Sequence, residues 1–358
     1  MAHVATITID HTKVPGDLTD YVGLIVPDGS AGYSALYALC LEGGGDIRLF
    51  KSDDSTELAR EVVSFSVSAE TGELHYRYTG TLSSSVDTDI HVYADGSSSD
   101  YAVGATYGRN AVWSDYDAVW HLKEGSGNTR LDSTGNNDLT DNQTVPNVAA
   151  QIGDGAELNG SSEYLEISDA AQTGLEGQSN LTVDFWLKSD SLSSDIYWLS
   201  KDQRGTSNRS FIVGAFTVSG SQNFAFAAYT SGSGIFSQST AHNMTTGTSY
   251  KLNYVWNGTT GNIEFFKDGV SQGSETNRTG SIDNTPSPVY LGAGAGFGGE
   301  RFHDGMLDEM RMHSGVRSTN WITTEYNNQN SPSTFYSVAA VAGGSAAQAA
   351  RRGVIMMM

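Results

Sequence analysis

Short stretches of alternating apolar and polar residues, separated by turn-forming residues, run along most of the chain. Residues 4–10 (VATITID) alternate in this way, and an apolar run at residues 21–26 (YVGLIV) ends at a Pro-Asp-Gly turn. A period of two is typical of half-buried β-strands. Between residues 30 and 41 the apolar side chains instead recur at helical spacing, which predicts one short helix.

The second part of the chain, from about residue 117 to 336, repeats this pattern of short strands and tight turns. Residues 180–190 (NLTVDFWLKSD) and 250–258 (YKLNYVWNG) alternate, and Asp268-Gly269 forms a hairpin turn after another such run. Many short strands in succession predict a jelly-roll sandwich. A chain of 358 residues is also long enough for two domains.

The composition narrows the class of protein. Charged residues make up only 17% of the chain and glycine supplies 41 positions, a balance typical of many strands joined by turns. The 41 acidic and 20 basic residues give a net charge of −21, which argues against binding a nucleic acid. Cys40 is the only cysteine, so neither an intramolecular disulfide nor a cysteine metal site is expected.

The sequence also predicts where the protein is made. Its first residues lack the basic start and apolar run of a secretion signal. No stretch approaches the ~20 apolar residues that cross a bilayer. We therefore expect synthesis in a cytoplasm and no insertion into a membrane.

Several motifs of the second part occur in the order found in a known family. They are Trp120-His121-Leu122 with Glu124, the loop 132–136 (DSTGN), 155–160 (GAELNG) with Tyr164, the Phe185-Trp186 strand, the hairpin 267–269 (KDG) and the closing strand 305–311 (GMLDEMR). In this combination the segment resembles a laminin-G-like, concanavalin A-type lectin domain.

Motifs of the first part carry a second resemblance. Residues 44–49 (GGDIRL), 52–58 (SDDSTEL) and 82–96 are similar to a β-domain of unknown activity that precedes lectin-like domains in bacterial surface and phage proteins. We expect an all-β protein with three parts. These are a small N-terminal β-sandwich at residues 1–108, a concanavalin A-like jelly-roll sandwich at 109–337, and a Gly/Ala tether with an apolar docking tail at 338–358.

Calcium is the metal hypothesis that the residues allow. The loop 132–138 (DSTGNND) offers the carboxylate and amide oxygens that Ca²⁺ prefers, and in similar domains this loop often holds the ion. On the closing strand, alternation places Asp308 on one face with Met306, Met310 and Met312, where a carboxylate must be paired or coordinated. The predicted ligands are Asp132, Asn136, Asp138 and Asp308. The alternatives are an Asx-rich turn closed by its own side chains and a hydrogen-bonded core acid.

A glycan site needs an aromatic face with polar groups beside it. The predicted ligand-binding residues are Tyr197, Trp198, Arg204 in the loop 201–209, and Tyr229. Because alternate residues of a strand face the core, packing is the alternative for each of these aromatic side chains.

Hydrolysis of a glycosidic bond is the catalytic alternative for this fold. It needs two carboxylates on one strand face, and the chain has no Glu-x-Asp-x-Glu run. Asp308 and Glu309 are adjacent, so regular alternation points them to opposite faces. We therefore expect that the protein is not an enzyme.

The end of the chain suggests a docking element. A Gly/Ala stretch is followed by two basic and five apolar residues, Arg351, Arg352, Val354, Ile355, Met356, Met357 and Met358. A solvated tail seldom ends in this way, so a peptide that docks on a partner or on copies of the chain is expected. A disordered end is the alternative.

These observations favour a virion structural protein of a phage-like virus, of head-fibre, decoration or tail-fibre type. Such a protein would assemble with other virion proteins and with itself, as a trimer for example, and would attach to host glycans. A bacterial cell-surface adhesin is the alternative function and location, and a glycoside hydrolase is the third.

Overall fold

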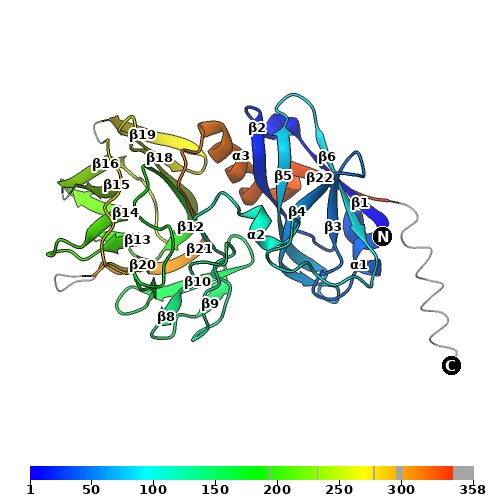
Figure 1. The fold of residues 1–358 in the computed structure, drawn as a ribbon, viewed down its shortest axis with the longest axis horizontal. Helices are drawn as coiled ribbons and strands as arrows, with labels where there is room; N and C mark the ends of the chain where they lie inside the picture. Colours follow the sequence, from blue (N-terminus) through cyan, green and yellow to red (C-terminus); the bar gives the residue numbers. More distant parts are fainter. Residues whose placement is uncertain (193–194, 232, 277–278, 296–300, 342–358) are drawn as a thin grey trace. The chain divides into compact units, whose positions relative to one another are not determined.

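The computed structural model describes residues 1–192, 195–231, 233–276, 279–295 and 301–341. The chain forms two compact units (Figure 1), one of residues Met1–Ser114 with the chain from Thr323 onward, and one of residues Asp115–Ile322. Most ordered elements of both units are antiparallel β-strands, so the predicted all-β class is confirmed. No helix in the described part of the chain is long and apolar enough to cross a membrane.

The first unit is built on a seven-stranded sheet in the order β2-β5-β4-β3-β6-β1-β22. Its strands are β1 (Ala2–Ile9), β2 (Leu18–Ile25), β3 (Arg48–Lys51), β4 (Glu57–Ser66), β5 (Thr71–Leu82), β6 (Thr88–Ala94) and β22 (Tyr336–Ala340). Its helices are the short 3-10 turns η1 (His11–Lys13) and η2 (Ala31–Tyr33), with α1 (Ser34–Leu39), α2 (Arg109–Val112) and α4 (Pro332–Phe335). The alternation of β1 buries Ile7 and Ile9, and the short helix expected between residues 30 and 41 is present as α1.

The chain returns to the first unit at its end, which corrects the predicted boundary at residue 337 and the predicted tether from 338. Helix α3 (Thr319–Asn330) runs across the division between the units, and β22 pairs with β1 from Ile9↔Tyr336 to Ala5↔Ala340. The side-chain amide of Asn328 accepts from the Leu24 backbone N–H and donates to its carbonyl. Sequence pattern missed β22 because a strand of small residues at a sheet edge is held by backbone hydrogen bonds and shows little alternation.

The second unit consists of two antiparallel sheets. One has the order β19-β18-β17-β12-β21-β10-β9, with β7 also paired to β21, and the other has the order β16-β15-β14-β13-β20-β11-β8. The strands are β7 (Ala118–Trp120), β8 (Thr140–Asn142), β9 (Asn147–Ala149), β10 (Asp154–Asn159), β11 (Tyr164–Ile167), β12 (Asn180–Ser189), β13 (Ile196–Asp202), β14 (Arg209–Val218), β15 (Ser221–Thr230), β16 (Ser233–Ala241), β17 (Ser249–Asn257), β18 (Asn262–Lys267), β19 (Val270–Thr276), β20 (Val289–Leu291) and β21 (Asp304–His313). The predicted hairpin at Asp268-Gly269 joins β18 to β19, with both residues at positive φ.

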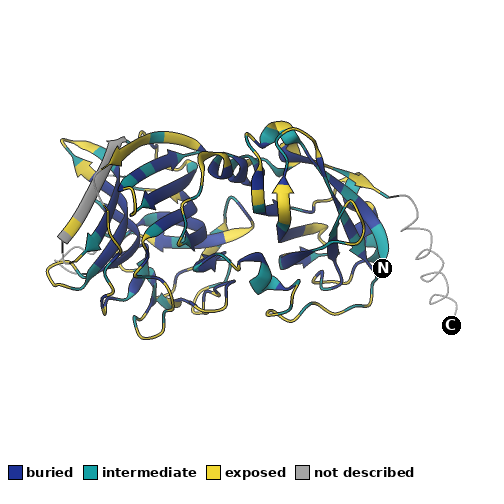
Figure 2. Cartoon of the chain, turned by 45° about the horizontal axis from the view of Figure 1, so that its top comes forward, coloured by how far each residue is buried: buried dark blue, intermediate teal, exposed yellow. Residues whose placement is uncertain are grey.

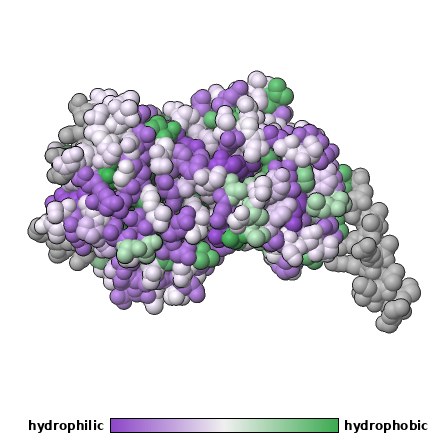
Figure 3. Space-filling model, viewed as in Figure 1, coloured by the Kyte–Doolittle hydropathy of each residue, from purple (hydrophilic) through white to green (hydrophobic). Residues whose placement is uncertain are grey.

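Apolar side chains from both sheets form one core in the second unit. Trp120, Phe185, Trp198, Phe226 and Trp256 belong to it, and each is at most 1% exposed. Figure 2 shows the buried residues concentrated on the strands, while Figure 3 shows hydrophilic side chains over much of the visible face of each unit. The acidic excess of the sequence is therefore compatible with an apolar interior in each unit.

A β-bulge in β21 changes which residues share a face with Asp308. Glu309 has φ +52°, and the pairing with β12 shifts register there. As a result Leu307, Met310 and Met312 all lie in the core, whereas Asp308 faces the other side of the sheet. The predicted common face of Asp308, Met310 and Met312 is therefore wrong, because regular alternation takes no account of the extra residue.

Candidate ligand-binding face of the second unit

The loop that the sequence singled out for calcium is closed around Asp132, which is 1% exposed. Its Oδ1 accepts from the backbone N–H groups of Val119 (2.8 Å) and Thr134 (2.9 Å). Its Oδ2 accepts from the Thr134 hydroxyl and from the N–H groups of Asn136 (3.2 Å) and Asn137 (2.9 Å). Five donors thus surround one carboxylate, which is the arrangement of a self-closed Asx-rich turn.

The other predicted calcium ligands have different surroundings. Asp138 is exposed and accepts from the Asp132 N–H at 2.8 Å, and the exposed Asn136 amide lies 3.5 Å from the Thr134 hydroxyl. Asp308 is fully buried and its Oδ2 accepts from the Ile152 N–H at 2.9 Å, which favours the alternative of a hydrogen-bonded acid. Donors already occupy the lone pairs of Asp132, which favours the alternative of a self-closed turn. Calcium binding at these residues stays a prediction.

Strand β13 separates two of the predicted glycan-binding residues. Trp198 is fully buried in the core between the sheets. Tyr197 faces the other side, and a register shift of β13 against β14 between Tyr197 and Leu199 leaves Trp198 and Leu199 both in the core. The assignment of Trp198 to a ligand site is wrong because adjacent residues of a strand face opposite sides, whereas Tyr197 lies on the outer face of the sheet.

A cluster of aromatic and charged side chains covers this outer face, which we define by Tyr197, Asp202, Arg209, Tyr229 and Arg301. Alternation along β15 places Ala225, Ala227 and Tyr229 together there, with their neighbours in the core. The Arg209 guanidinium pairs with Asp202 through Nε–Oδ1 (2.5 Å) and Nη2–Oδ2 (3.3 Å), and it lies over the Tyr229 ring at 4.2 Å.

Arg301 covers the other end of the face. Its guanidinium lies 5.5 Å from the Tyr197 ring centre and 5.6 Å from that of Phe216, and it pairs with Asp195. Tyr197 and Phe216 are themselves in edge contact, with ring centres 5.5 Å apart. Both ends of the face therefore repeat one arrangement, an arginine that contacts an aromatic ring and is paired with an acid.

The predicted residue Arg204 belongs to the same neighbourhood. It is exposed after the end of β13, and its N–H donates to the Ala295 carbonyl. Burial raises the pKa of Tyr197 to about 12 and also raises the pKa of Tyr229, and in both cases Arg204 and Arg209 oppose the rise. Both phenols are thus neutral donors at ordinary pH. The structure brings three of the four predicted residues together.

The face retains hydrogen-bonding capacity. Among the residues that the structure describes, the Arg209 side chain donates only to Asp202, although a guanidinium has five N–H groups. The hydroxyls of Tyr197 and Tyr229 likewise have no hydrogen-bond partner within the described ranges. Aromatic rings bordered by unused donors can hold a polar ligand with apolar patches.

Sequence reasoning missed Asp202, Arg209 and Arg301 as members of the face. The first two lie in the loop 201–209, but regular alternation along β13 would place Asp202 on the opposite face from Tyr197, so parity gave no signal for it. Lys201, in contrast, is buried and paired with Asp169 (2.6 Å) and Glu176 (3.0 Å). No local pattern indicates Arg301, because its contacts come from strands far earlier in the chain.

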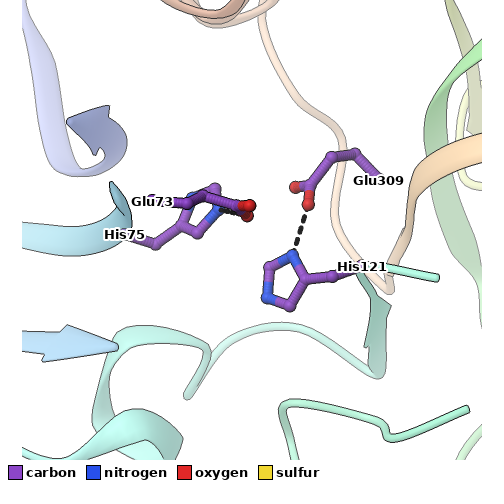
Figure 4. Close-up of side chains that lie close together, drawn as sticks. All are labelled: Glu73, His75, His121 and Glu309. Atoms are coloured by element: carbon purple, nitrogen blue, oxygen red, sulfur yellow. Dashed lines mark hydrogen bonds and ion pairs between the residues drawn. The ribbon is translucent and has the colours of Figure 1, made fainter. Parts of the chain in front are cut away.

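Each unit also contains a buried histidine–glutamate pair, drawn in Figure 4. In the second unit, Nδ1 of His121 bonds Glu309, which also binds Arg311. In the first unit, Nε2 of His75 lies 3.3 Å from Glu73. The spacing of Glu73 and His75 on one strand face is visible in sequence, whereas His121 and Glu309 are 188 positions apart. Within its own unit, each pair gives a buried charge a partner.

Comparison with known proteins supports the fold of the second unit. Residues 159–323 match the model of the concanavalin A-like lectin/glucanases superfamily. The second unit contains a concanavalin A-like domain. This confirms the resemblance that the sequence motifs carried for this part of the chain, and the match includes every residue of the outer face.

Several solved structures are similar to this chain in fold. They include domain 4 of AbnA, a GH43 extracellular arabinanase from Geobacillus stearothermophilus, in complex with arabinotriose (18% identity over 58% of this chain and 97% of that chain, TM-score 0.46), a native heptameric SAP-like pentraxin from Limulus polyphemus (19%, 42% and 70%, 0.34), and the ligand-binding domain of botulinum neurotoxin serotype D in complex with N-acetylneuraminic acid (13%, 62% and 53%, 0.45). The chain spans about half the length of the toxin domain. At such identities and TM-scores these likenesses transfer no function. No curated protein sequence matches the chain.

The predicted docking residues lie outside the described residues. They are Arg351, Arg352, Val354, Ile355, Met356, Met357 and Met358.

Proposed function

We propose that the concanavalin A-like domain is a carbohydrate-recognition module and that the protein acts by attachment, without turnover. The observation that supports this is the set of unused donors on the outer face, namely the Arg209 guanidinium and the Tyr197 and Tyr229 hydroxyls. The Tyr229 ring beside them is half-buried, whereas Tyr197 is only 2% exposed, so Tyr229 and Arg209 form the accessible part of the face. This part suits a ligand that is apolar on one side and rich in hydroxyls at its rim.

A sugar ring has this character. Its C–H groups would lie against the Tyr229 ring, and its hydroxyls would accept from Arg209 and exchange hydrogen bonds with the phenols. Asp202 would fix the guanidinium, since their two-point pairing holds its plane in one orientation. Arg204, exposed nearby, would add a charge that favours acidic sugars.

The acids of the face favour binding over hydrolysis. A retaining glycosidase needs two carboxyl groups ~5 Å apart, one as acid and one as nucleophile. On this face Asp202 is paired with Arg209, and Asp195 with Arg301. A carboxylate committed to an arginine is a poor proton donor, which is the reason for proposing a module that is not an enzyme.

The setting that we propose is a virion, in which the domain is displayed outward and the protein assembles with other virion proteins and with copies of itself. The sequence supports this through the resemblance of the first part to domains of phage and bacterial surface proteins. A cell-surface adhesin is the competing setting. Mass spectrometry of purified particles, with a search for peptides of this chain, separates the two.

The binding proposal is tested by glycan-array screening of the full chain, followed by calorimetry with the best ligand. Tyr229→Ala should weaken binding about tenfold or more, ~1.4 kcal/mol, because it removes the stacking surface. Tyr101→Ala is the matched control, since Arg48 lies over Tyr101 at 4.1 Å in the first unit. Absence of any glycan ligand, or equal loss in both variants, would refute the proposal.

A further inference from the structure

The first unit contains a cluster of ligand-type side chains that glycan binding does not use. It consists of His3 on β1, His91 on β6, and Asp54 in the turn between β3 and β4. One ring nitrogen of each histidine and one carboxylate oxygen all lie within 4.8 Å of one another. The His3 and His91 rings are stacked, with centres 4.3 Å apart.

A β-bulge brings the two histidines together. The register of β1 against β6 shifts between His3 and Ala5, so that Val4 is an extra residue. Val4 and Ala5 are both fully buried, although successive residues of a regular strand face opposite sides. The extra residue therefore returns His3 to the outer side of the sheet, beside His91.

The backbone conformation of Asp54 directs its carboxylate toward the two histidines. Asp54 has φ +55°, a left-handed conformation that Asp tolerates better than most residues. The preceding Asp53 holds the turn by accepting from the N–H groups of Ser55 (2.8 Å) and Thr56 (2.7 Å). In this turn, Oδ1 of Asp54 lies 2.5 Å from His91 Nδ1.

We propose that His3, His91 and Asp54 bind a divalent transition-metal ion of the zinc class. Two imidazoles and a carboxylate suit Zn²⁺, Ni²⁺ or Cu²⁺, whereas Ca²⁺ and Mg²⁺ prefer oxygen ligands alone. Zinc ligands lie ~2.0–2.2 Å from the ion, so donors within 4.8 Å of one another need only small side-chain rotations to reach it.

The surroundings of the cluster suit such an ion. The side chain of Asp54 is 52% exposed and that of His91 is 15% exposed, which leaves a path for entry. The Tyr93 hydroxyl donates to Oδ1 of Asp54 at 2.8 Å and would orient the carboxylate from outside the coordination sphere. Water would complete the coordination. Binding requires neutral imidazoles, so the ion would displace any proton shared by His91 and Asp54.

A second group in the same unit provides an internal control. Asp10, His11 and Asp87 also lie within ligand distance of one another, but they offer one nitrogen instead of two. Removal of His11, which is more exposed than His91 (36% against 15%), should therefore leave zinc binding at the His3–His91–Asp54 site unchanged while it removes one imidazole.

The test is calorimetric titration of the full chain with ZnCl₂ in a buffer that does not bind metals. Wild-type protein should show one site that His91→Ala and Asp54→Asn each weaken at least tenfold, and that His11→Ala leaves unchanged. Calcium should produce no heat at this site. Asp54 is largely exposed, so Asp54→Asn folds even if His91→Ala does not. Absence of zinc binding, or equal affinity in wild type and Asp54→Asn, would overturn the proposal.

Discussion

Two regions of the second unit, the loop 132–138 and the outer face, use buried acidic residues differently. In the loop 132–138, Asp132 accepts five hydrogen bonds from its own loop and from β7. On the outer face, Asp202 pairs with Arg209, whose guanidinium lies over Tyr229. The Asp132 carboxylate is occupied by donors of the loop and of β7, whereas the face retains donors that no described residue uses.

The difference shows how an acidic loop and a binding face are told apart. An Asp among Asn, Ser and Thr is as suited to closing a turn as to holding a cation, because the same oxygens serve both. What decides is the number of N–H groups directed at the carboxylate. At Asp132 these donors leave few free lone pairs to bind an ion. At Asp202 the partner is the Arg209 side chain, which can also contact a ligand.

The largest expected effect is on the loop. Asp132→Ala should lower the free energy of unfolding by about 4 kcal/mol, because the buried N–H groups of Val119, Thr134 and Asn137 lose their acceptor, at ~1–3 kcal/mol each. Urea denaturation followed by tryptophan fluorescence measures the loss.

Asp138→Ala is the matched control for that variant. Asp138 is exposed and accepts one backbone hydrogen bond, so its loss should be about 1 kcal/mol or less. Equal losses in the two variants would show that Asp132 does not close the loop. A calcium-dependent rise in melting temperature that Asp132→Ala abolishes would favour the cation site instead.

Much of the fold was predictable because it follows from alternation and turn chemistry. Strand β1 from Ala5 onward, the hairpin at Asp268-Gly269 and the jelly-roll order of the second unit all obey these local rules. The return of the chain to the first unit was not predictable, because β22 is held by pairing with β1, more than 300 positions away. Small residues in an edge strand give no pattern to detect.

The candidate site was predictable in part. Tyr197, Arg204 and Tyr229 were found because aromatic and basic residues in strands and loops are visible in sequence. Trp198 was misplaced because adjacent residues of a strand face opposite sides, so it cannot share a face with Tyr197. The face of Asp308 was misjudged because the β-bulge at Glu309 changes the parity of the residues that follow it. Bulges depend on how neighbouring strands pair, and a single strand's sequence does not specify them.

The dependence of the free energy of unfolding on pH should sharpen the comparison between the loop 132–138 and the outer face, because one titrating group lies near each. Complete burial lowers the pKa of His303, two residues from Arg301, to about 4, whereas the unfolded chain titrates near 6.5. The stability contributed by neutral His303 is present above pH 6.5 and is lost as the pH falls toward 4. Between pH 7.5 and 5 the loss should be about 2 kcal/mol.

Asp117 should act in the opposite direction. Its carbonyl accepts from Asn137 of the loop, and burial raises its pKa to about 6. A carboxyl group whose pKa is raised by folding favours the folded state at low pH, and this contribution is lost as the pH rises through 6. Lowering the pH from 7.5 to 5 should therefore add about 1 kcal/mol to the free energy of unfolding through this group. In urea denaturation at pH 7.5 and 5, Asp117→Asn should lose more stability than wild type, and His303→Gln should lose less. The reverse order would contradict both assignments.

The smallest expected effect is on the outer face itself. Tyr229→Ala should lower the free energy of unfolding by about 1 kcal/mol, because the ring is half-buried and its contact with the Arg209 guanidinium at 4.2 Å is worth ~0.5–1 kcal/mol. A double-mutant cycle of Tyr229→Leu with Arg209→Lys, measured by urea denaturation, isolates this coupling.

A loss in Tyr229→Ala as large as that in Asp132→Ala would remove the contrast between the two regions. It would mean that Tyr229 is a packing residue and that the outer face serves stability, as the loop does. A small loss of stability combined with a tenfold loss of glycan affinity has only one explanation within this fold, because a ring that contributes little to folding and much to binding must contact the ligand.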